Sequence, residues 1–399
     1  MFQMKKKTAM SGLATLAVAG LTIGVSASAF ADPAIPGPLP YRTLVAAGSD
    51  TIQDVSNGFA AAALDSYGYP SVLGSYDATG TAQIQTRSGG QSFVRPNGST
   101  NGLRALRASM DPDNYLWNGV EVGGQVDIAR SSSAPPQTTP AEVSYIPFAV
   151  DAVTWAHSPS FPIGSIPLGT SVGQDTDGDG IRDLTLMNIF GYDSGSTATI
   201  TLESTGVPVT TKTVGIQGSG AQIIPFIPQA GSGTRSFWQG KVGGTFSLLT
   251  SDTFTDGTGT GTNDVQEHDG SVTAEIPNAV VPFSIAQYIA QGNSIEGVTD
   301  RRHGAVLGSI NSVAPVTGGV LNTSFPIKRN VYFVASTERL TSEPSNPDDA
   351  ALVKFLLGTG SGDSPWVCDM TDTITEYGFG LMSTGCGVVE GYRSLASLG

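Results

Sequence analysis

Charged side chains are scarce in this chain, and positive ones are the scarcest. Of the 399 residues, 14% are charged, with 20 Lys plus Arg against 34 Asp plus Glu, and the formal net charge is −14. A nucleic-acid-binding surface needs many Lys and Arg side chains to neutralise phosphates, so the composition excludes that class of function. A small anion is not excluded, because a local pocket can be positive inside an acidic surface.

Long apolar runs are also missing beyond the N-terminus. No later segment approaches the roughly 18 apolar residues that a membrane span needs. The chain instead begins like a secretory signal, with lysines at 5–7, an apolar stretch over 12–25 and small residues at 29 and 31 before Asp32. No Cys lies near this cleavage site, so we do not expect a lipid anchor. We predict that residues 1–31 form a signal peptide and that the mature protein is exported and soluble.

Cysteine is nearly absent, and its two copies, Cys368 and Cys386, lie close together near the C-terminus. A redox or metal-binding pair is disfavoured, because the pair lacks C-x-x-C spacing and has no His nearby. In an exported protein such a pair is typical of a disulfide. We therefore predict a structural Cys368–Cys386 disulfide.

Glycine and proline are abundant, with 51 Gly and 24 Pro, which favours many loops and short strands. At about 150 residues per domain, the length predicts two domains. Residues 197–217 alternate apolar and polar side chains, a pattern that predicts a β-hairpin. Late helices are expected around residues 283–291 and 350–357.

Four short turns rich in Gly, Ser and Thr follow apolar segments, at residues 48–51, 98–102, 131–133 and 231–235. Three of them precede apolar residues at helical spacing, which predicts a strand, a Gly turn and a helix N-terminus.

These turns are suited to holding an anion. Helix N-termini present unpaired N–H groups and partial positive charge, Ser and Thr hydroxyls add donors, and Gly lets backbone amides approach closely. The alternative is that each Ser or Thr merely caps its own helix. Four turns in the same context favour one common site.

The four turns also resemble the anion-binding loops of periplasmic phosphate-binding proteins of the PstS kind, and they come in the order of that family. They read Gly-Ser-Asp-Thr at 48–51, Gly-Ser-Thr-Asn-Gly at 98–102, Val-Asp-Ile-Ala-Arg-Ser-Ser at 126–132 and Gly-Ser-Gly-Thr-Arg at 231–235. Residues 145–153 and 325–332 are similar to the two interdomain crossovers of the family, and 377–381 to its C-terminal signature. The resemblance covers roughly residues 43–385.

The resemblance implies which residues bind the anion. One branch of the family has an Arg at the position of Pro228, whereas Arg235 fits another branch. The first branch also has an Asp at the position of Ser132, which leaves Asp50 as the candidate acceptor of a phosphate proton. The implied ligands are Asp50, Thr51, Ser99, Ser131, Ser132, Ser232, Gly233 and Thr234, with Arg130 and Arg235 as sources of positive charge.

An acidic motif at residues 175–183 is typical of a calcium loop, with oxygens at positions 1, 3, 5 and 9, a Gly at position 6 and a backbone carbonyl at position 7. It resembles the loops of dockerin or thrombospondin-type repeats, but Leu186 stands where an EF-hand has its bidentate Glu. The alternative is an acidic turn without metal. We expect structural calcium bound by Asp175, Asp177, Asp179, Asp183 and the Ile181 carbonyl.

Two patterns could indicate an enzyme. Residues 169–173 match the G-x-S-x-G pattern of hydrolases, but no helix is expected to follow, as that motif requires. Glu267, His268 and Asp269 combine acids and an imidazole in a Gly-rich segment, where we expect a surface loop. The alternative is that this segment borders the cleft. We therefore predict that the protein is not an enzyme.

These observations predict an α/β protein with the two-lobed fold of type 2 periplasmic binding proteins and a hinge of two crossovers. Lobe I is expected to comprise residues 32–149 plus 327–399, and lobe II residues 150–326, with the calcium loop and the hairpin as insertions. The expected function is capture of inorganic phosphate or a related tetrahedral oxyanion by a monomer, for delivery to an ABC permease. A secreted phosphatase-like hydrolase and a surface-interaction protein on the same scaffold are the alternatives.

Overall fold

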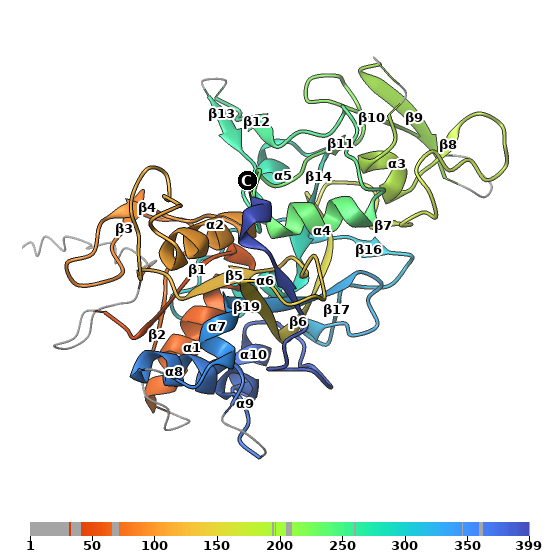
Figure 1. The fold of residues 1–399 in the computed structure, drawn as a ribbon. Helices are drawn as coiled ribbons and strands as arrows, with labels where there is room; N and C mark the ends of the chain where they lie inside the picture. The colour runs from red at the N-terminus through yellow and green to blue at the C-terminus, as the bar shows by residue number, and fades with distance from the viewer. Residues whose placement is uncertain are drawn as a thin grey trace, which may run out of the picture.

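The computed structural model describes residue 32 and residues 41–65, 72–193, 195, 197–204, 210–258, 261–344, 346–358 and 362–398 (Figure 1). The predicted signal peptide, residues 1–31, lies outside the described residues. None of the helices within these ranges is both long and apolar enough to cross a bilayer.

A large mixed sheet forms the centre of the fold. Its strands follow the order β11-β14-β6-β19-β5-β1-β2, and β15 and β20 also pair with β6, one at each end of that strand. β1 is parallel to β2 and β5, whereas β19 is antiparallel to β5 and β6. This sheet with its surrounding helices confirms the predicted α/β fold class. The strands are β1 (Leu44–Gly48), β2 (Leu73–Ser75), β5 (Ile128–Ser131), β6 (Val143–His157), β11 (Ile224–Pro225), β14 (Ala279–Ser284), β15 (Val306–Leu307), β19 (Lys328–Ser336) and β20 (Gly391–Arg393).

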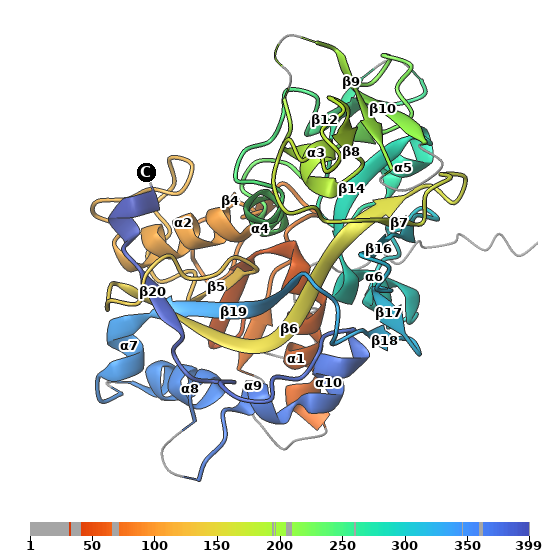
Figure 2. The ribbon, with the colours of Figure 1, turned by 90° about the vertical axis from the view of Figure 1, so that its right-hand side faces the viewer.

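Strand β6 passes through both halves of the molecule (Figure 2). Its first part pairs with β19 up to Ala152, and its last part pairs with β14 from Val153 to His157. The register of β6 and β19 shifts between Val331 and Tyr332, which leaves Phe148 of β6 as the extra residue of a bulge. All but one of the 15 residues of β6 are buried, so the strand is covered on both faces.

Buried apolar side chains form separate cores on the two sides of this crossing. Two clusters draw their buried residues from 44–149 and 331–398, apart from Ala286 and Ala290, and we call this part lobe I. The other two clusters draw theirs from 152–327, and we call this part lobe II. This division follows the cores alone, and the domain boundaries stay a prediction.

Helices begin where the Gly-rich turns end, as predicted for three of them: α1 (Gln53–Asp65), α2 (Ser99–Met110) and α4 (Gly233–Lys241). A short 3-10 helix, η1 (Asp50–Ile52), leads directly into α1. The late helices are confirmed as α6 (Ile285–Gly292) and α8 (Pro347–Leu356). The remaining described helices are α3 (Leu186–Phe190), α5 (Ser271–Glu275), α7 (Thr337–Thr341), α9 (Trp366–Asp369), α10 (Thr371–Glu376) and the 3-10 helix η2 (Leu395–Leu398).

Short strands outside the central sheet form smaller sheets. The predicted hairpin is confirmed by β9 (Thr199–Glu203) and β10 (Thr211–Gly215), which are antiparallel, and β8 (Arg182–Asp183) joins β9. The two-stranded pairs are β3 (Gln83–Ile84) with β4 (Phe93–Val94), β7 (Ser165–Ile166) with β16 (Ser309–Ile310), β12 (Thr253–Thr255) with β13 (Thr262–Asp264), and β17 (Val316–Thr317) with β18 (Val320–Leu321).

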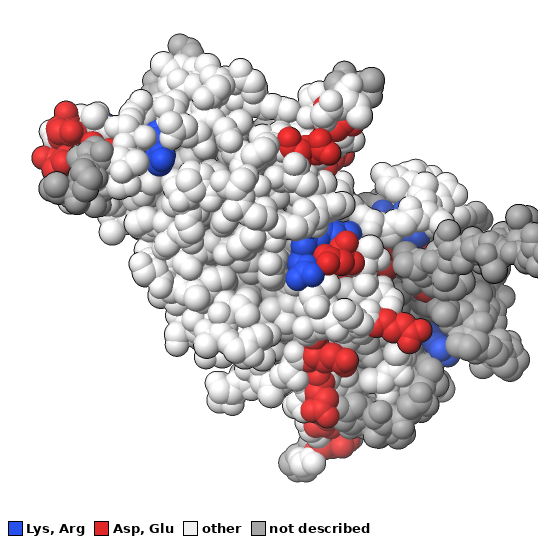
Figure 3. Space-filling model, turned by 180° about the vertical axis from the view of Figure 1, so that it is seen from behind, with Lys and Arg blue, Asp and Glu red and all other residues white. Residues whose placement is uncertain are grey.

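The surface carries few charges. Figure 3 shows one face that is largely uncharged, with acidic side chains in small separate groups and few basic ones. This face has no broad basic area, in agreement with the argument from composition.

The predicted disulfide is confirmed. Cys368 of α9 and Cys386 are bonded, with Cα atoms 6.0 Å apart, and both pack against the lobe I core. The bond closes a loop with a sequence separation of 18 residues.

Replacing both cysteines by alanine should lower the free energy of unfolding by about 3 kcal/mol, because the unfolded chain regains the entropy of a loop of this length. Calorimetric melting of the oxidised protein and the double variant measures the difference. Anion affinity should be the same in both proteins, because the bond lies far along the chain from all four turns. Two titratable thiols in the unfolded, non-reduced protein would contradict the disulfide.

Candidate functional site

Two of the Gly-rich turns touch where the lobes meet. The backbone N–H of Thr100 in lobe I donates to the carbonyl oxygen of Gly231 in lobe II at 3.3 Å. Gly98 and Gly231 both have a φ of about +91°, in the left-handed region that favours glycine. A Cβ atom on Gly98 would also lie 2.5 Å from the Gly231 oxygen. The absence of side chains at this point therefore lets the two lobes meet backbone to backbone.

Hydroxyl groups from both lobes gather beside this contact. Ser132 Oγ lies 3.2 Å from Ser49 Oγ, 3.2 Å from Thr51 Oγ1 and 3.4 Å from Ser99 Oγ. Thr51 Oγ1 reaches across the lobes to Thr234 Oγ1 at 3.4 Å. We call the whole set the hydroxyl cluster: Ser49, Thr51, Ser99, Ser132, Ser232 and Thr234, each at most 1% exposed.

The sequence predicted five members of this cluster, and Gly233 lies beside them at the start of α4. A Cβ atom at Gly233 would collide with the hydroxyl oxygens of Ser99 and Ser132, so only glycine lets the helix N-terminus come this close to lobe I. Ser232 is the N-cap of α4, and its hydroxyl accepts a hydrogen bond from the Arg235 N–H at 2.9 Å.

Glu267 also belongs to this site, so the expectation of a surface loop at residues 267–269 is wrong for Glu267 and His268. Both residues are at most 1% exposed. Glu267 Oε1 accepts from the Ser232 hydroxyl and, at 3.0 Å, from the Thr234 N–H, while Oε2 accepts from the Thr51 hydroxyl at 3.4 Å. A Gly-rich acidic segment normally stays in water, and here donors of the α4 N-terminus compensate the burial of its carboxylate.

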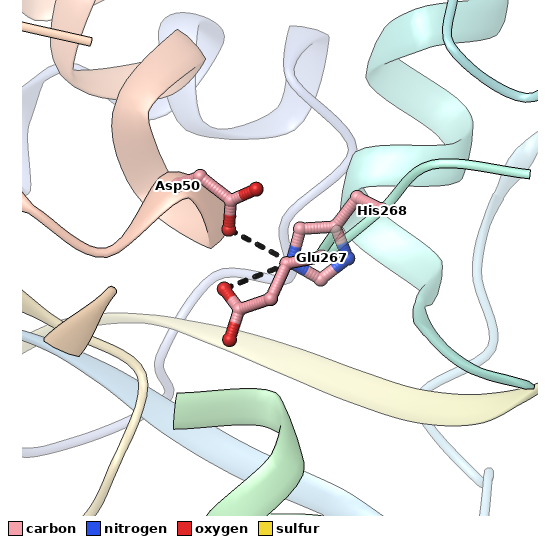
Figure 4. Close-up of side chains that lie close together, drawn as sticks. All are labelled: Asp50, Glu267 and His268. Atoms are coloured by element: carbon pink, nitrogen blue, oxygen red, sulfur yellow. Dashed lines mark ion pairs between the residues drawn. The ribbon is translucent and has the colours of Figure 1, made fainter. Parts of the chain in front are cut away.

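His268 points its Nε2 atom at the two carboxyl groups of the site (Figure 4). Its Nδ1 accepts from the Ser284 backbone N–H at 3.2 Å, so in the neutral ring the proton sits on Nε2. That Nε2 lies 2.9 Å from Thr51 Oγ1, 3.5 Å from Asp50 Oδ1 and 3.7 Å from Glu267 Oε2. Burial lowers the pKa of His268 and favours the neutral ring.

The same geometry argues against a metal at this site. Asp50, Glu267 and His268 each place a ligand-type atom within 4.8 Å of the others. A metal would need the lone pair of Nε2, but the Ser284 N–H occupies the Nδ1 lone pair and leaves the proton on Nε2. His268 is therefore a hydrogen-bond donor to this site.

The two carboxyl groups have opposite ionisation preferences. Burial and then the charge of Glu267 raise the pKa of Asp50 well above its usual range. Burial alone would also raise the pKa of Glu267, but its interactions with Asp50, His268 and Ser232 outweigh burial and hold that pKa below the usual range. Near neutral pH the site thus favours one neutral acid, Asp50, beside one carboxylate, Glu267.

Arg329 brings a positive charge to the cluster from β19. Its guanidinium contacts Asp151 Oδ2 through Nε at 3.0 Å and Nη2 at 2.9 Å. It also donates to Thr234 Oγ1 at 2.9 Å and to the Ser132 carbonyl at 3.2 Å. Asp151 Oδ1 in turn accepts from the Ser284 hydroxyl at 2.8 Å. Neither charge was expected in the site, although both lie in the two predicted crossovers and Asp151 stands between apolar residues of β6.

Three predicted site residues turn away from the cluster. Arg130 is fully buried and donates to Ser75 Oγ at 2.7 Å and the Tyr76 carbonyl at 2.6 Å, inside lobe I. Burial lowers the pKa of Arg130 to about 10. The Ser131 hydroxyl donates to the Ser133 carbonyl.

The guanidinium of Arg235 points to the far side of α4. Its Nη1 pairs with Asp252 at 2.6 Å and donates to the Pro228 carbonyl at 3.0 Å. Successive helical residues are rotated by about 100°, so Arg235 and Thr234 face different directions.

The acidic loop gathers part of the predicted calcium set. Carboxylate oxygens of Asp175, Asp177 and Asp179 lie within 4.8 Å of one another. The Asp183 carboxylate instead accepts from Gln174 Nε2 at 2.6 Å and from the Thr176 hydroxyl. The Ile181 N–H donates to Asp179 Oδ1 at 2.7 Å. A counter-charge is already present, because Arg182 pairs with Asp175 at 3.0 Å.

The G-x-S-x-G pattern does not form a nucleophile elbow. Ser171 is exposed, and turns and bends follow it up to β8 rather than a helix. Two surface cavities lie elsewhere, one of about 610 Å³ beside residues 87–91 and one of about 410 Å³ beside residues 162–167. Neither is lined by residues of the hydroxyl cluster.

Comparisons with known proteins gave similarities in structure only. No protein-family profile and no curated protein sequence matches this chain. A substrate-binding protein of a phosphate ABC transporter from Clostridium perfringens, with phosphate bound, is 14% identical over 85% of this chain and 99% of its own, with a TM-score of 0.45. An ABC-type phosphate transport receptor from Vibrio cholerae is 12% identical over 85% and 100%, with a TM-score of 0.43. The CcmR regulatory domain of Synechocystis in complex with 2-PG is 13% identical over 82% and 96%, with a TM-score of 0.37.

The raised pKa of Asp50 predicts a pH-dependent effect of Asp50→Asn. A folded-state pKa above the unfolded value means that the folded protein holds this proton more tightly than the unfolded chain does, so the stability that Asp50 contributes is lost as pH rises through the folded pKa. Asparagine does not titrate and has no such loss. Relative to the parent protein, the variant should therefore gain in melting temperature as pH rises from about 4, the usual pKa of an unfolded Asp, toward the raised pKa. A difference that is constant or falls over this range would contradict a raised pKa.

Calcium should raise the melting temperature, and chelation should lower it, if residues 175–183 bind the ion. Repulsion among Asp175, Asp177 and Asp179 is relieved by a divalent cation. Scanning calorimetry with calcium or EDTA measures the shift, and Asp177→Asn should abolish it while anion specificity stays the same. Identical melting curves under both conditions would show that the loop is a turn without metal.

Proposed function

We propose that this chain binds a small tetrahedral oxyanion, with inorganic phosphate as the favoured ligand, between the two lobes at the hydroxyl cluster. One observation carries the proposal: buried hydroxyls of both lobes, with Thr51 Oγ1 3.4 Å from Thr234 Oγ1, gather at the first turn of α4, where the Thr234 N–H donates to a carboxylate. Hydroxyls and helix-terminal N–H groups are the donors that hold phosphate in proteins, and each is stronger when water is excluded. Because the lobes touch at Gly98 and Gly231, the ligand enters when they separate.

Arg329 is the source of positive charge in this proposal. Its side chain is 3% exposed, and its guanidinium already donates to Thr234 Oγ1, so it polarises a hydroxyl that faces the ligand. Arg301 adds a second positive charge, with Nη1 4.0 Å from Asp50 Oδ2. These two arginines take the role that the sequence resemblance gave to Arg130 and Arg235.

Asp50 favours phosphate over sulfate. Its Oδ1 is buried and has no hydrogen-bond partner, so it can accept a hydrogen bond from a protonated phosphate oxygen. Sulfate has no proton to offer near neutral pH, and an ionised Asp50 would repel it. Burial and then the Glu267 charge raise the pKa of Asp50, so in this proposal the rejection of sulfate sets in as pH rises above that raised pKa and Asp50 ionises.

Binding without hydrolysis is the role we propose, with phosphate passed on to an ABC permease after export. The exposed Ser171 without a following helix supports binding over hydrolysis. The signal-like N-terminus and the crossover-like segments support export and transport. Absence of turnover of p-nitrophenyl phosphate, together with phosphate binding, would separate this role from that of a phosphatase.

Thr234→Val should lower the affinity for phosphate by about ten- to a hundredfold. The change keeps the shape of the side chain but removes a hydrogen bond to a charged ligand, and such a bond contributes roughly 1.5–3 kcal/mol. Isothermal titration of the mature protein with phosphate, sulfate, arsenate and phosphonates measures the change.

Arg235→Ala serves as the matched control, since its guanidinium is held by Asp252 on another side of α4. It should keep phosphate affinity within about threefold of the parent. A loss of tenfold or more would show that Arg235 supplies positive charge to the ligand. If Thr234→Val also keeps full affinity, or if no oxyanion binds, the proposed site is wrong.

A further inference from the structure

The Glu267 carboxylate sits where an external anion would sit. Its Oε1 accepts hydrogen bonds from the Ser232 hydroxyl and, at 3.0 Å, from the Thr234 N–H. These are two of the donors that the N-terminus of α4 offers to a ligand. Its Oε2 accepts a hydrogen bond from the Thr51 hydroxyl of the other lobe at 3.4 Å. The carboxylate thus bridges the lobes with the same donors that the proposed function assigns to phosphate.

Glu267 is held like a bound anion rather than like a member of a salt bridge. Within the described part of the chain, the one basic side chain paired with it is His268, at 3.7 Å. The Nδ1 contact with Ser284 makes that imidazole a neutral donor. The Arg329 guanidinium lies behind the Thr234 hydroxyl and pairs directly with Asp151.

A second observation points independently to a ligand at this place. Asp50 Oδ1 is buried and lacks a hydrogen-bond partner, although it lies 3.5 Å from His268 Nε2 beside the Glu267 carboxylate (Figure 4). Buried carboxyl oxygens are normally satisfied, so this acceptor is suited to a group that offers a proton. A protonated phosphate oxygen would supply it, whereas the ionised Glu267 offers no proton.

The segment that carries Glu267 belongs to lobe II, as do Ser232 and Thr234. It follows β13 and is tied to lobe II by hydrogen bonds from Gln229 N to Val265 O at 2.8 Å and from Gln291 Nε2 to His268 O at 3.0 Å. His268 has a φ of 54°, in the left-handed region that few residues other than glycine adopt. The carboxylate therefore stays tethered next to the α4 N-terminus whether or not lobe I is engaged.

We propose that Glu267 is an internal anion that occupies the oxyanion site, and that an external oxyanion binds by replacing its carboxylate. The inference rests on the proposed function for the identity of the external ligand. It gives Glu267 the role of a competitor that lowers affinity for phosphate and keeps the empty protein closed.

The test compares Glu267→Ala with the parent protein and with Glu203→Ala, a control at another buried glutamate, in β9. Melting temperature is measured in chloride, formate, acetate and phosphate at equal ionic strength, and phosphate affinity by isothermal titration. Glu267→Ala should melt below the parent in chloride. Formate, acetate or phosphate should raise its melting temperature by several degrees more than that of the parent or the control, because ligands stabilise the state they bind.

Phosphate affinity separates this inference from the proposed function. Glu267→Ala should bind phosphate about tenfold or more tightly than the parent, because the competitor is gone. If the parent binds phosphate and the variant binds it equally or less tightly, Glu267 is not a competitor and the inference fails while the function stands. If carboxylates stabilise the variant selectively but phosphate binds neither protein, the internal-anion role is supported and the phosphate function fails.

Glu267→Gln covers the case in which the alanine variant does not fold. It keeps the shape of the side chain but loses the charge, so it should compete more weakly and also raise phosphate affinity above that of the parent. Equal or lower affinity in Glu267→Gln, or anions that stabilise Glu267→Ala no more than the control, would overturn the proposal.

Discussion

The ion pair between Arg329 and Asp151 is the interaction on which the rest of the site depends. The two residues are direct partners across β19 and β6, and both are almost fully buried. Arg329 also holds the Ser132 carbonyl of lobe I and the Thr234 hydroxyl of lobe II, while Asp151 holds the N-terminus of α6. Loss of one partner would leave an uncompensated buried charge, at a cost of about 3–5 kcal/mol. The pair therefore fixes both sides of the hydroxyl cluster to the two strands that join the lobes.

Local patterns in the sequence were enough to predict the helix starts and most of the hydroxyls. Thr51 and Ser232 follow turns whose Gly residues and helical spacing can be recognised within a dozen positions. Glu267 could not be found in this way, because its partner Thr51 is 216 positions away and its own neighbours resemble a solvated loop. Arg235 was assigned to the site because it resembles the Arg of one branch of the family, yet one step along a helix from Thr234 turns a side chain by about 100°.

The cluster is built from groups that can reverse their roles. A hydroxyl both donates and accepts, so Thr51 can serve His268, Ser132 or a ligand by rotating one hydrogen. His268 cannot do this, because Ser284 fixes its tautomer. The site thus combines a rigid set of donors, the amides and the imidazole, with an adaptable set, the hydroxyls. This combination suits anions of different shape, planar or tetrahedral, with little movement of the heavy atoms.

The continuity of β6 has a mechanical consequence. One strand of 15 residues belongs to both cores, so the lobes cannot part by slack in a loop alone. Any opening has to twist or bend this strand, and the bulge at Phe148 is where its hydrogen-bond ladder is already interrupted. The strand would then resist twisting along most of its length and twist most easily at the bulge. A small rotation there becomes a larger displacement at the distant rim of lobe II. The resistance of the strand to twisting therefore favours the contact between the lobes at Gly231 that the structure shows.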